Sequence, residues 1–272
     1  KKQLNILTEG IFIPIRLSSE RLPRKILKLV NGKPILYYML ERIMKSNFIN
    51  SKKNIVVCTT KDKADDILEN KVKYYGASIF RGSKNDLIKR FYDANKIFNF
   101  NRILLIDGDD PLIFPEHLDK VMKEQKNSKY QCVYTNDLPF GLNVKSITSN
   151  ALKKVYNNYL STKNDTGFGL YFTNSNILKS KKINNLKFNN LLSKARLTLD
   201  YIEDFRLIKK IIIDMYSKKN CNYAFDKFEK YIIKNSSILN INLFRQDENL
   251  QRSKLKVKLK YKNKNKTLKI IY

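Results

Sequence analysis

The fold can be inferred from one segment, IFIPIRLSSERLPRKIL at Ile11–Leu27. Its first part, Ile11–Ile15, is an apolar run with the length of one buried strand, too short to indicate a helix. The loop Arg16–Lys25 follows, with four cations and two hydroxyl groups in ten residues. Gly32-Lys33-Pro34 then marks a turn before the helical spacing of Ile35–Ile43. α/β proteins hold phosphate at the carboxyl edge of a sheet with this order of strand, loop and helix. A solvated basic loop without function is the alternative.

The rest of the chain alternates between short apolar runs and amphipathic segments. Strands are expected at Asn54–Thr59, Ala77–Phe80, Arg102–Ile106, Gln131–Thr135, after the turn at Pro139–Val144, at Gly167–Phe172 and at Ala195–Leu199. Helical spacing is expected at Asp62–Tyr74, Asp86–Phe98, Pro115–Lys126, Ala151–Tyr159, Ile202–Ser217 and Tyr223–Leu239. Strands joined by helices of this length imply a Rossmann-like α/β fold, a mostly parallel mixed sheet flanked by helices.

The regular alternation breaks after Asn136. We therefore expect one main domain over residues 1–245, in which residues 137–194 form a small excursion from the main sheet and a candidate dimerisation arm. Residues 246–272 form a basic C-terminal extension, because Lys254–Lys269 alternates Lys with Leu, Val, Tyr and Asn. This tract could be an exposed strand pair or the lead-in to a further segment. A homodimer is the expected assembly.

Composition excludes several classes of protein. The 272 residues are 42% hydrophobic and 11% aromatic, which is enough for a folded core. The formal net charge of +29 would ordinarily indicate a nucleic-acid partner. However, the lysines are spread among Asn, Ile and Tyr in the manner of an AT-rich genome, so no specific nucleic acid is expected. The three cysteines form no CxxC pair and indicate buried reduced thiols. No apolar stretch could span a membrane, and a cytoplasmic location is expected.

Acidic side chains follow two of the expected strands. Asp107-Gly108-Asp109-Asp110-Pro111 places three carboxylates around a glycine, and they would repel one another unless a cation neutralised them. Mg²⁺ takes one or two carboxylates and completes its shell with water and phosphate oxygens. The alternative is an acidic turn in which Asp110 caps the next helix. Asp200 likewise follows a strand and could be either a metal ligand or the N-cap of the next helix.

Several motifs together resemble one family. They are Pro14-x-Arg16-x-x-Ser19-x-Arg21-Leu22-Pro23-x-Lys25, Gly32-Lys33-Pro34, Phe80-Arg81-Gly82-Ser83 with Arg90, Gly108-Asp109-x-Pro111-Leu112-Ile113 and Arg196-Leu197-Thr198-x-Asp200-x-x-Glu203-Asp204. In this order they resemble the CTP-dependent sugar-acid cytidylyltransferases, the spore-coat-polysaccharide branch most of all. The 3-deoxy-manno-octulosonate cytidylyltransferases are relatives. The resemblance covers about residues 11–240 and implies a Rossmann-like nucleotidyltransferase fold.

The resemblance also implies roles for individual residues. Arg16, Arg21 and Lys25 match the loop around the CTP triphosphate, to which Pro14 and Ser19 also belong. Asp109 matches the main Mg²⁺ ligand and Asp200 the second carboxylate at the metal. The remaining nucleotide-binding candidates are Thr59, Thr60, Asp62, Arg81, Ser83 and Gly108.

The implied reaction is attack of an acceptor oxygen on the α-phosphorus of CTP, with release of pyrophosphate. Positive charge from Arg16, Lys25 and the other arginines would stabilise the leaving group, and Mg²⁺ would activate the acceptor hydroxyl. No histidine base is then required. The single histidine, His117, is expected to have a surface or capping role.

Departures from the family pattern lie in the expected acceptor region. Asn143 and Lys145 stand where relatives often carry an acidic pair, and Asn164-Asp165-Thr166-Gly167 lacks a histidine common in the family. Arg24 stands where many relatives have glycine. The added cation at Lys145 favours an anionic acceptor, such as a sugar acid, a phosphorylated polyol or a phosphonate, for a CMP-activated product in surface polysaccharide or glycolipid biosynthesis.

Two competing classes stay open. A nucleotidyltransferase of similar fold that uses UTP or GTP would usually carry a glycine-rich first loop, which is absent here. A basic nucleic-acid-binding protein would be retained on DNA with a steep salt dependence. The carboxylates at the strand ends argue against the second class, because without metal they would repel a phosphate backbone.

Overall fold

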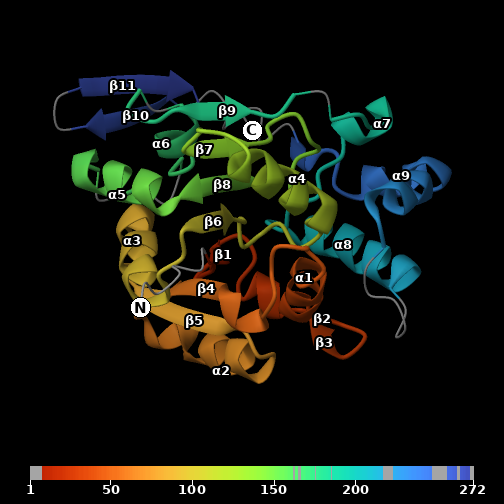
Figure 1. Ribbon diagram of the computed structural model, residues 1–272. Helices are drawn as coiled ribbons and strands as arrows, with labels where there is room; N and C mark the ends of the chain where they lie inside the picture. Colours follow the sequence, from red (N-terminus) through yellow and green to blue (C-terminus); the bar gives the residue numbers. More distant parts are fainter. Residues whose placement is uncertain are drawn as a thin grey trace.

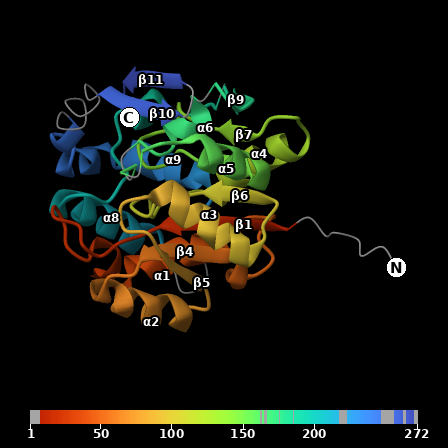
Figure 2. The same ribbon diagram turned by 90° about the vertical axis from the view of Figure 1, so that its left-hand side faces the viewer.

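A computed structural model of the chain contains a seven-stranded mixed sheet with helices on both faces (Figures 1 and 2). The structure describes residues 8–161, 163–164, 167–174, 176–184, 186–216, 223–246, 256–261 and 264–269. Within these residues, no helix combines the length and the apolar character needed to cross a lipid bilayer.

The strand order in the main sheet is β5-β4-β1-β6-β8-β7-β9. The bounds are β1 Glu9–Pro14, β4 Ile55–Thr60, β5 Ser78–Gly82, β6 Arg102–Leu105, β7 Cys132–Tyr134, β8 Lys145–Thr148 and β9 Ser180–Lys182. β1 pairs in parallel with both β4 and β6, and β4 pairs in parallel with β5. β8 is antiparallel to β6 and β7, whereas β7 and β9 are parallel. The expected mostly parallel mixed sheet is confirmed.

The helices cover both faces of the sheet. They are α1 Ile35–Ile43, α2 Asp66–Tyr74, α3 Leu87–Phe98, α4 Pro115–Lys126, α5 Ser149–Asn158, α6 Leu170–Thr173, α7 Asn190–Ser193, α8 Ile202–Met215 and α9 Phe225–Lys234. Figure 2 shows α3 and α5 in front of the strands, and Figure 1 shows α1, α4 and α8 on the other side. Short 3-10 helices lie at Lys25–Leu27 (η1), Lys52–Asn54 (η2), Lys63–Asp65 (η3) and Ser236–Ile241 (η4).

The interior strand β1 is buried on both faces. In β1, Ile11 and Ile13 belong to the hydrophobic cluster beneath α1, α4 and α8, while Phe12 belongs to the cluster beneath α3 and α5. Successive side chains of a strand point to opposite faces, so an uninterrupted apolar run fits a strand covered on both sides. Cys58 and Cys132 are buried free thiols, as expected, whereas Cys221 lies outside the described residues.

Two expected strands are wrong. Residues 167–169 form a turn, and α6 begins at Leu170. The buried residues Phe168, Tyr171 and Phe172 are spaced for one helical face, which a short apolar run does not distinguish from a strand. Residues 195–199 form no strand: they make one isolated bridge, between Phe140 and Arg196, and the chain bends at Thr198.

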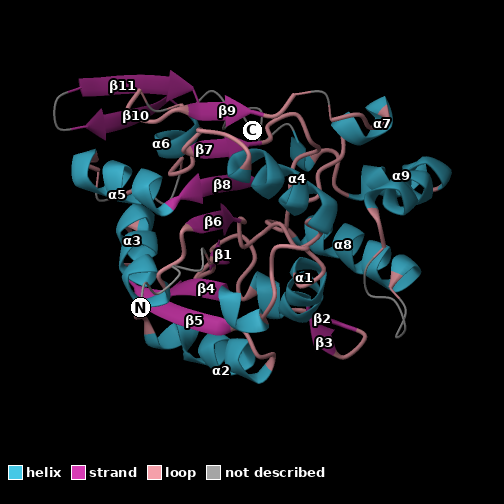
Figure 3. Cartoon of the chain, viewed as in Figure 1, coloured by secondary structure: helices cyan, strands magenta, loops and turns pink. Residues whose placement is uncertain are grey.

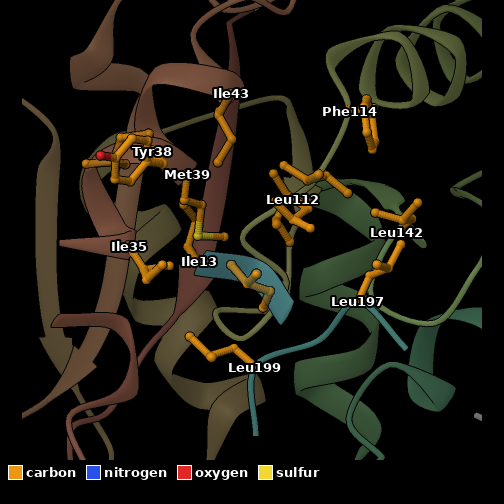
Figure 4. Packing of buried hydrophobic residues seen from close by; sticks show 14 of the residues in the cluster. Ile13, Ile35, Tyr38, Met39, Ile43, Leu112, Phe114, Leu142, Leu197 and Leu199 are labelled. Atoms are coloured by element: carbon orange, nitrogen blue, oxygen red, sulfur yellow. The ribbon is translucent and has the colours of Figure 1, made fainter. Parts of the chain in front are cut away.

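Residues 195–199 are buried as deeply as a strand, although they join no sheet. Leu197 and Leu199 point into the same core as Ile13 and Leu112 (Figure 4). The amide N–H of Leu197 donates to the carbonyl oxygen of Phe140. The apolar signal in the sequence therefore comes from side-chain burial and not from pairing in the sheet.

The segment 137–194 is joined to the main sheet more closely than an excursion would be. It supplies β8, which lies between β6 and β7, and the edge strand β9. Its role in dimerisation stays a prediction. The C-terminal tract does contain a strand pair, in which β10 (Lys256–Tyr261) and β11 (Lys264–Lys269) are antiparallel. Near the other end of the chain, β2 (Leu29–Val30) and β3 (Lys33–Pro34) form a second antiparallel pair.

Candidate active site

The loops that leave β1 and β6 meet at the carboxyl edge of the sheet, near the start of α8 (Figure 3). The loop after β1 is anchored by Leu17, Leu22 and Ile26, whose side chains are buried in the main hydrophobic cluster. The backbone N–H of Leu17 donates to the carboxylate of Asp65 at 2.8 Å. These anchors leave the arginines of the loop on its exposed side.

One residue of this loop has a left-handed backbone. Arg24 has φ +52° at the N-terminus of η1, a conformation that costs a residue with a Cβ roughly 1–2 kcal/mol. Glycine adopts it without that cost. The difference from the family pattern at this position is therefore one of backbone strain as well as charge.

Lys25 joins the acidic side chains of two distant loops. Its ammonium nitrogen Nζ lies 3.2 Å from Oδ2 of Asp109 and 2.9 Å from Oδ1 of Asp200. A guanidinium nitrogen of Arg21 lies 3.0 Å from the same oxygen of Asp200. The carboxylates expected at the ends of two segments therefore converge, and two cations from the first loop reach them.

Asp109 is held in place by its own backbone and by a close approach at Gly108. The carbonyl oxygen of Asp109 accepts hydrogen bonds from the N–H of Leu199 at 2.7 Å and from the hydroxyl of Thr198 at 3.2 Å. A Cβ on Gly108 would collide with the carbonyl oxygen of Pro14, so glycine lets the loops after β1 and β6 pack together.

Asp200 is oriented by a buried ion pair. The fully buried guanidinium of Arg196 lies 3.3 Å from Oδ2 of Asp200 and makes two hydrogen bonds, of 2.8 and 3.0 Å, to Asp204. Asp204 also accepts from the backbone N–H groups of Asp200 and Tyr201. The N-cap of α8 is Tyr201, and the N-cap of α4 is Phe114. The capping alternatives for Asp200 and Asp110 are therefore wrong, and the contact with Lys25 places Asp200 at the candidate site.

The ionisation of this cluster depends on its neighbours. Burial is the main cause of the raised pKa of Asp109; the attraction to Lys25 lowers this pKa, whereas the negative charges of Asp200 and Asp107 raise it. The pKa of Asp110 is raised well above its usual value by burial and by the negative charges of Asp109 and Asp107. For Asp200, burial opposes ionisation, but Lys25 and Arg21 together lower the pKa. Asp109 therefore lies, partly buried, among neighbouring carboxylates, and a further cation there would be favoured.

Other candidate residues are engaged elsewhere. The hydroxyls of Thr59 and Thr60 both donate to Asp65, at 2.8 and 2.5 Å. Arg81 donates to the carbonyl oxygens of Thr60 and Asp62 and contacts Asp66 and Glu69. To donate a hydrogen bond to a nucleotide, the hydroxyls of Thr59 and Thr60 would have to give up their hydrogen bonds to Asp65. The hydroxyl of Ser83 accepts from the backbone N–H of Asp86.

The two acceptor candidates differ in the structure. Asn143 closes a turn, because its side-chain amide both accepts from the N–H of Leu138 and donates to the carbonyl oxygen of that residue. Lys145 at the start of β8 lies beside the end of β6, with its ammonium 3.6 Å from Asp107 and 5.6 Å from the ring centroid of Phe168. Lys145 is thus next to the acidic loop that carries Asp109. Asp165 and Thr166 lie outside the described residues.

The expectation that His117 lies at the surface or caps a helix is wrong. It is 6% exposed within α4, and its ring packs against Phe114 and Phe225. Burial, together with the positive charges of Lys120 and Arg42, lowers its pKa to about 4. Its place in the core arises from ring packing, which the spacing of a single histidine does not reveal.

Sequence reasoning missed Asp65 and Asn242 as parts of the site. Asp65 connects the loop after β1 to the end of β4 through the hydrogen bonds described above. Asn242 reaches Asp204 from the C-terminal part of the chain. The contacts of Asp65 with Leu17 and of Asn242 with Asp204 join residues 48 and 38 positions apart, so a local pattern does not reveal them. The acidic residues just after β4 could have drawn attention to Asp65.

In comparisons with known proteins, residues 11–231 match the family model for cytidylyltransferases. A cytidylyltransferase structure from Leptospira borgpetersenii is 31% identical, with a TM-score of 0.76, and the match covers 86% of this chain and 97% of that one. The spore coat polysaccharide biosynthesis protein SpsF of Bacillus subtilis is 26% identical over 73% of this chain and 84% of its own length. A 3-deoxy-manno-octulosonate cytidylyltransferase of Rickettsia bellii is 34% identical over 46% of this chain and 50% of its own length.

Proposed function

This chain belongs to the cytidylyltransferase family, and we propose that it couples CTP to a small anionic acceptor and releases pyrophosphate. The acceptor in this proposal is a sugar acid such as a 3-deoxy-ulosonic acid, and the CMP-activated product serves surface polysaccharide or glycolipid synthesis. The relatives named for 3-deoxy-manno-octulosonate and for spore coat polysaccharide support this substrate class. A phosphonate or a phosphorylated polyol is the alternative acceptor.

The observation that carries the proposal is the contact of Lys25 with both Asp109 and Asp200. An ammonium group and two carboxylates at the carboxyl edge of the parallel strands supply both kinds of charge that nucleotidyl transfer needs. The cation can move to the phosphates of a nucleotide, which leaves oxygen ligands for a metal.

In the proposed reaction, the acceptor oxygen attacks the α-phosphorus of CTP, and the bond from that phosphorus to the pyrophosphate oxygen breaks. Lys25, Arg21 and Arg16 stabilise the negative charge that develops on pyrophosphate. The loop anchored by Leu17 and Asp65 holds these cations on one side of the site. Pro14, Ser19 and Gly108 shape the backbone around the triphosphate, and the end of β4 lies beside the base.

The residues present fit a Mg²⁺ ion. Oxygens of Asp109 and Asp200 converge within hydrogen-bond distance of one Nζ atom, so both could face one cation. In the described part of the chain, no group of three or more His, Cys, Asp or Glu side chains is placed to hold a metal. Two carboxylates suit Mg²⁺ when phosphate and water oxygens complete its shell. When bound, Mg²⁺ would neutralise phosphate charge and make the acceptor hydroxyl more acidic.

The proposed acceptor contact is Lys145. Its side chain is 15% exposed and lies beside Asp107, in the loop that also carries Asp109. An acceptor carboxylate or phosphate could pair with this ammonium while its hydroxyl faced the α-phosphate. Asn143 would contribute by keeping the turn before β8 closed.

The proposal is tested by incubating the protein with Mg²⁺, one nucleoside triphosphate and one acceptor, and measuring pyrophosphate. The acceptors are 3-deoxy-ulosonic acids, a phosphonate, a phosphorylated polyol and neutral sugars. We expect release with CTP and an anionic acceptor. Turnover of neutral sugars alone would reject the acceptor class, and turnover with UTP or GTP alone would reject CTP. Absence of turnover together with salt-dependent retention on DNA would favour a nucleic-acid-binding protein.

A further inference from the structure

The side-chain amide of Asn242 is buried against the ion pair that supports Asp200. Asn242 is 1% exposed. Its Nδ2 atom donates to the carbonyl oxygen of Arg196 at 2.9 Å and to Oδ1 of Asp204 at 2.8 Å. Because both partners are acceptors, only the NH₂ side of the amide satisfies this position. The contact spans 38 positions of sequence to Asp204 and 46 to Arg196.

A chain of contacts leads from Asn242 to the candidate metal ligand. Asp204 holds the guanidinium of Arg196 and also accepts from the backbone N–H of Asp200 at 2.8 Å. Arg196 in turn contacts the Oδ2 atom of Asp200. The other carboxylate oxygen of Asp200 faces Lys25 and Arg21. Both the backbone and the side chain of Asp200 are thus positioned by residues that Asn242 touches.

The segment that carries Asn242 is anchored to the start of α8. Ile238 and Leu239 of η4 are buried in the main core. Three residues past Asn242, the guanidinium of Arg245 lies 3.2 Å from the carboxylate of Glu203 and 4.4 Å from the ring centroid of Tyr201. The contacts of Arg245 with Glu203 and Tyr201 limit how far the amide of Asn242 can move relative to Asp204.

We propose that Asn242 is a positioning residue for catalysis, which holds Asp200 in its working orientation through Asp204 and Arg196. This inference rests on the proposed function. It extends the site to a part of the chain beyond residue 231, where the match to the family model ends.

The physical reason is the shared use of Asp204. Two N–H groups of the backbone, the guanidinium of Arg196 and the amide of Asn242 all point at one carboxylate. Without the Asn242 amide, Oδ1 of Asp204 and the carbonyl oxygen of Arg196 each lose one hydrogen-bond donor. Asp204 and Arg196 can then shift, and Asp200, which both of them contact, shifts with them. Mutation of residues that support a metal ligand through hydrogen bonds typically changes metal affinity or activity about 10- to 100-fold.

The experiment compares Asn242→Ala with two controls on the same segment. Asn240→Ala changes an exposed asparagine of η4. Leu239→Ala removes a buried side chain and destabilises the segment while leaving the Asn242 amide in place. All proteins are assayed well below their Tm for kcat and for KM of CTP. The dissociation constant of Mn²⁺ is measured by electron paramagnetic resonance in the presence of CTP without acceptor.

For N242A we expect a decrease in kcat and a weakening of Mn²⁺ binding of about 10-fold or more, with KM for CTP changed less than kcat. For N240A and L239A we expect kcat and the dissociation constant of Mn²⁺ to stay within about twofold of the wild type, although the Tm of L239A falls. The inference is overturned if N242A matches N240A, if L239A loses kcat equally, or if N242A does not fold, because the role is then structural. A wild-type protein without turnover would instead refute the proposed function itself.

Discussion

Lys25 and Asp200 are in direct contact across 175 positions of sequence, with Nζ 2.9 Å from Oδ1. The same ammonium reaches Asp109, 84 positions from Lys25. The raised pKa of Lys25 reflects this arrangement: burial is the largest single effect and opposes the charge, but Asp109 and Asp200 together outweigh it. The three side chains are therefore one electrostatic unit, and changing any of them alters the other two.

Replacing Lys25 by alanine is expected to lower kcat by roughly 10²–10³, because the developing charge on pyrophosphate loses its nearest cation. Mg²⁺ should raise the Tm of this variant more than that of the wild type, since the carboxylates of Asp109 and Asp200 no longer have the ammonium between them. Steady-state kinetics and thermal unfolding with and without Mg²⁺ measure both effects. The matched control is Lys28→Ala, whose side chain lies over the ring of Phe205. An unchanged kcat in K25A would refute the role of Lys25.

Asp109→Asn is expected to abolish turnover while the fold is kept, because the amide has nearly the same shape but cannot hold a divalent cation as a carboxylate does. Circular dichroism and pyrophosphate release check the two parts of this prediction. Asp137→Asn is the control, since Asp137 pairs with Lys182 on the edge strand β9 and lies outside the acidic loop. Comparable activity of D109N and the wild type would contradict the proposed site.

Lys145→Gln is expected to raise the KM for an anionic acceptor by about 10-fold or more, the size of effect of losing a charge-assisted hydrogen bond. The KM for CTP should change little, because Lys145 lies beside Asp107 and not in the loop of Lys25. The control is Lys182→Gln. If K145Q used anionic and neutral acceptors in the same ratio as the wild type, Lys145 would not be an acceptor contact.

Gly108→Ala is expected to lower the free energy of unfolding by about 1–3 kcal/mol, because the new methyl group would collide with the carbonyl of Pro14. It should also lower kcat, since the collision moves Asp109. At Gly169 the nearest atom to a new Cβ is Cε of Lys145 at 3.2 Å, near the end of a flexible side chain. G169A should therefore lose less stability in urea unfolding; equal losses in the two variants would show that the Pro14 contact does not matter.

His117 is expected to make stability depend on pH. Its pKa is about 4 in the folded protein and near 6.5 when exposed, so the unfolded chain binds more protons between these values. The free energy of unfolding should therefore fall as pH decreases from 6.5 toward 4, by up to about 3 kcal/mol. Its full contribution is present above pH 6.5.

Urea unfolding of the wild type and of His117→Phe across this pH range measures the effect. The phenyl ring can pack against Phe114 and Phe225 without taking up a proton, so the pH slope should be smaller in H117F. Arg42 and Lys120, which also lower the histidine pKa, are unchanged in both proteins. Identical slopes would mean that His117 does not bind protons differently in the two states.

The local pattern predicted most of the regular elements correctly. The apolar runs at β1, β4 and β6 and the helical spacing of α1, α3, α4 and α8 depend on burial on each element's own faces, and that is visible within a few residues. The same rule failed at residues 195–199, where the side chains of Leu197 and Leu199 are buried but the backbone joins no sheet. It failed at α6 because an apolar run as short as 167–172 predicted a strand, although Phe168, Tyr171 and Phe172 have the spacing of one helical face.

The type of fold and the available chemistry could be predicted from local sequence, because alternating apolar runs, a cationic loop and acidic strand ends are local features. Only the tertiary structure decided which charges meet. Lys25, Asp109 and Asp200 come from three separate segments, and Asn242 reaches their support from a fourth. The energy of an ion pair or hydrogen bond depends on the separation of its atoms in space and on their burial. Neither quantity is set by distance along the chain.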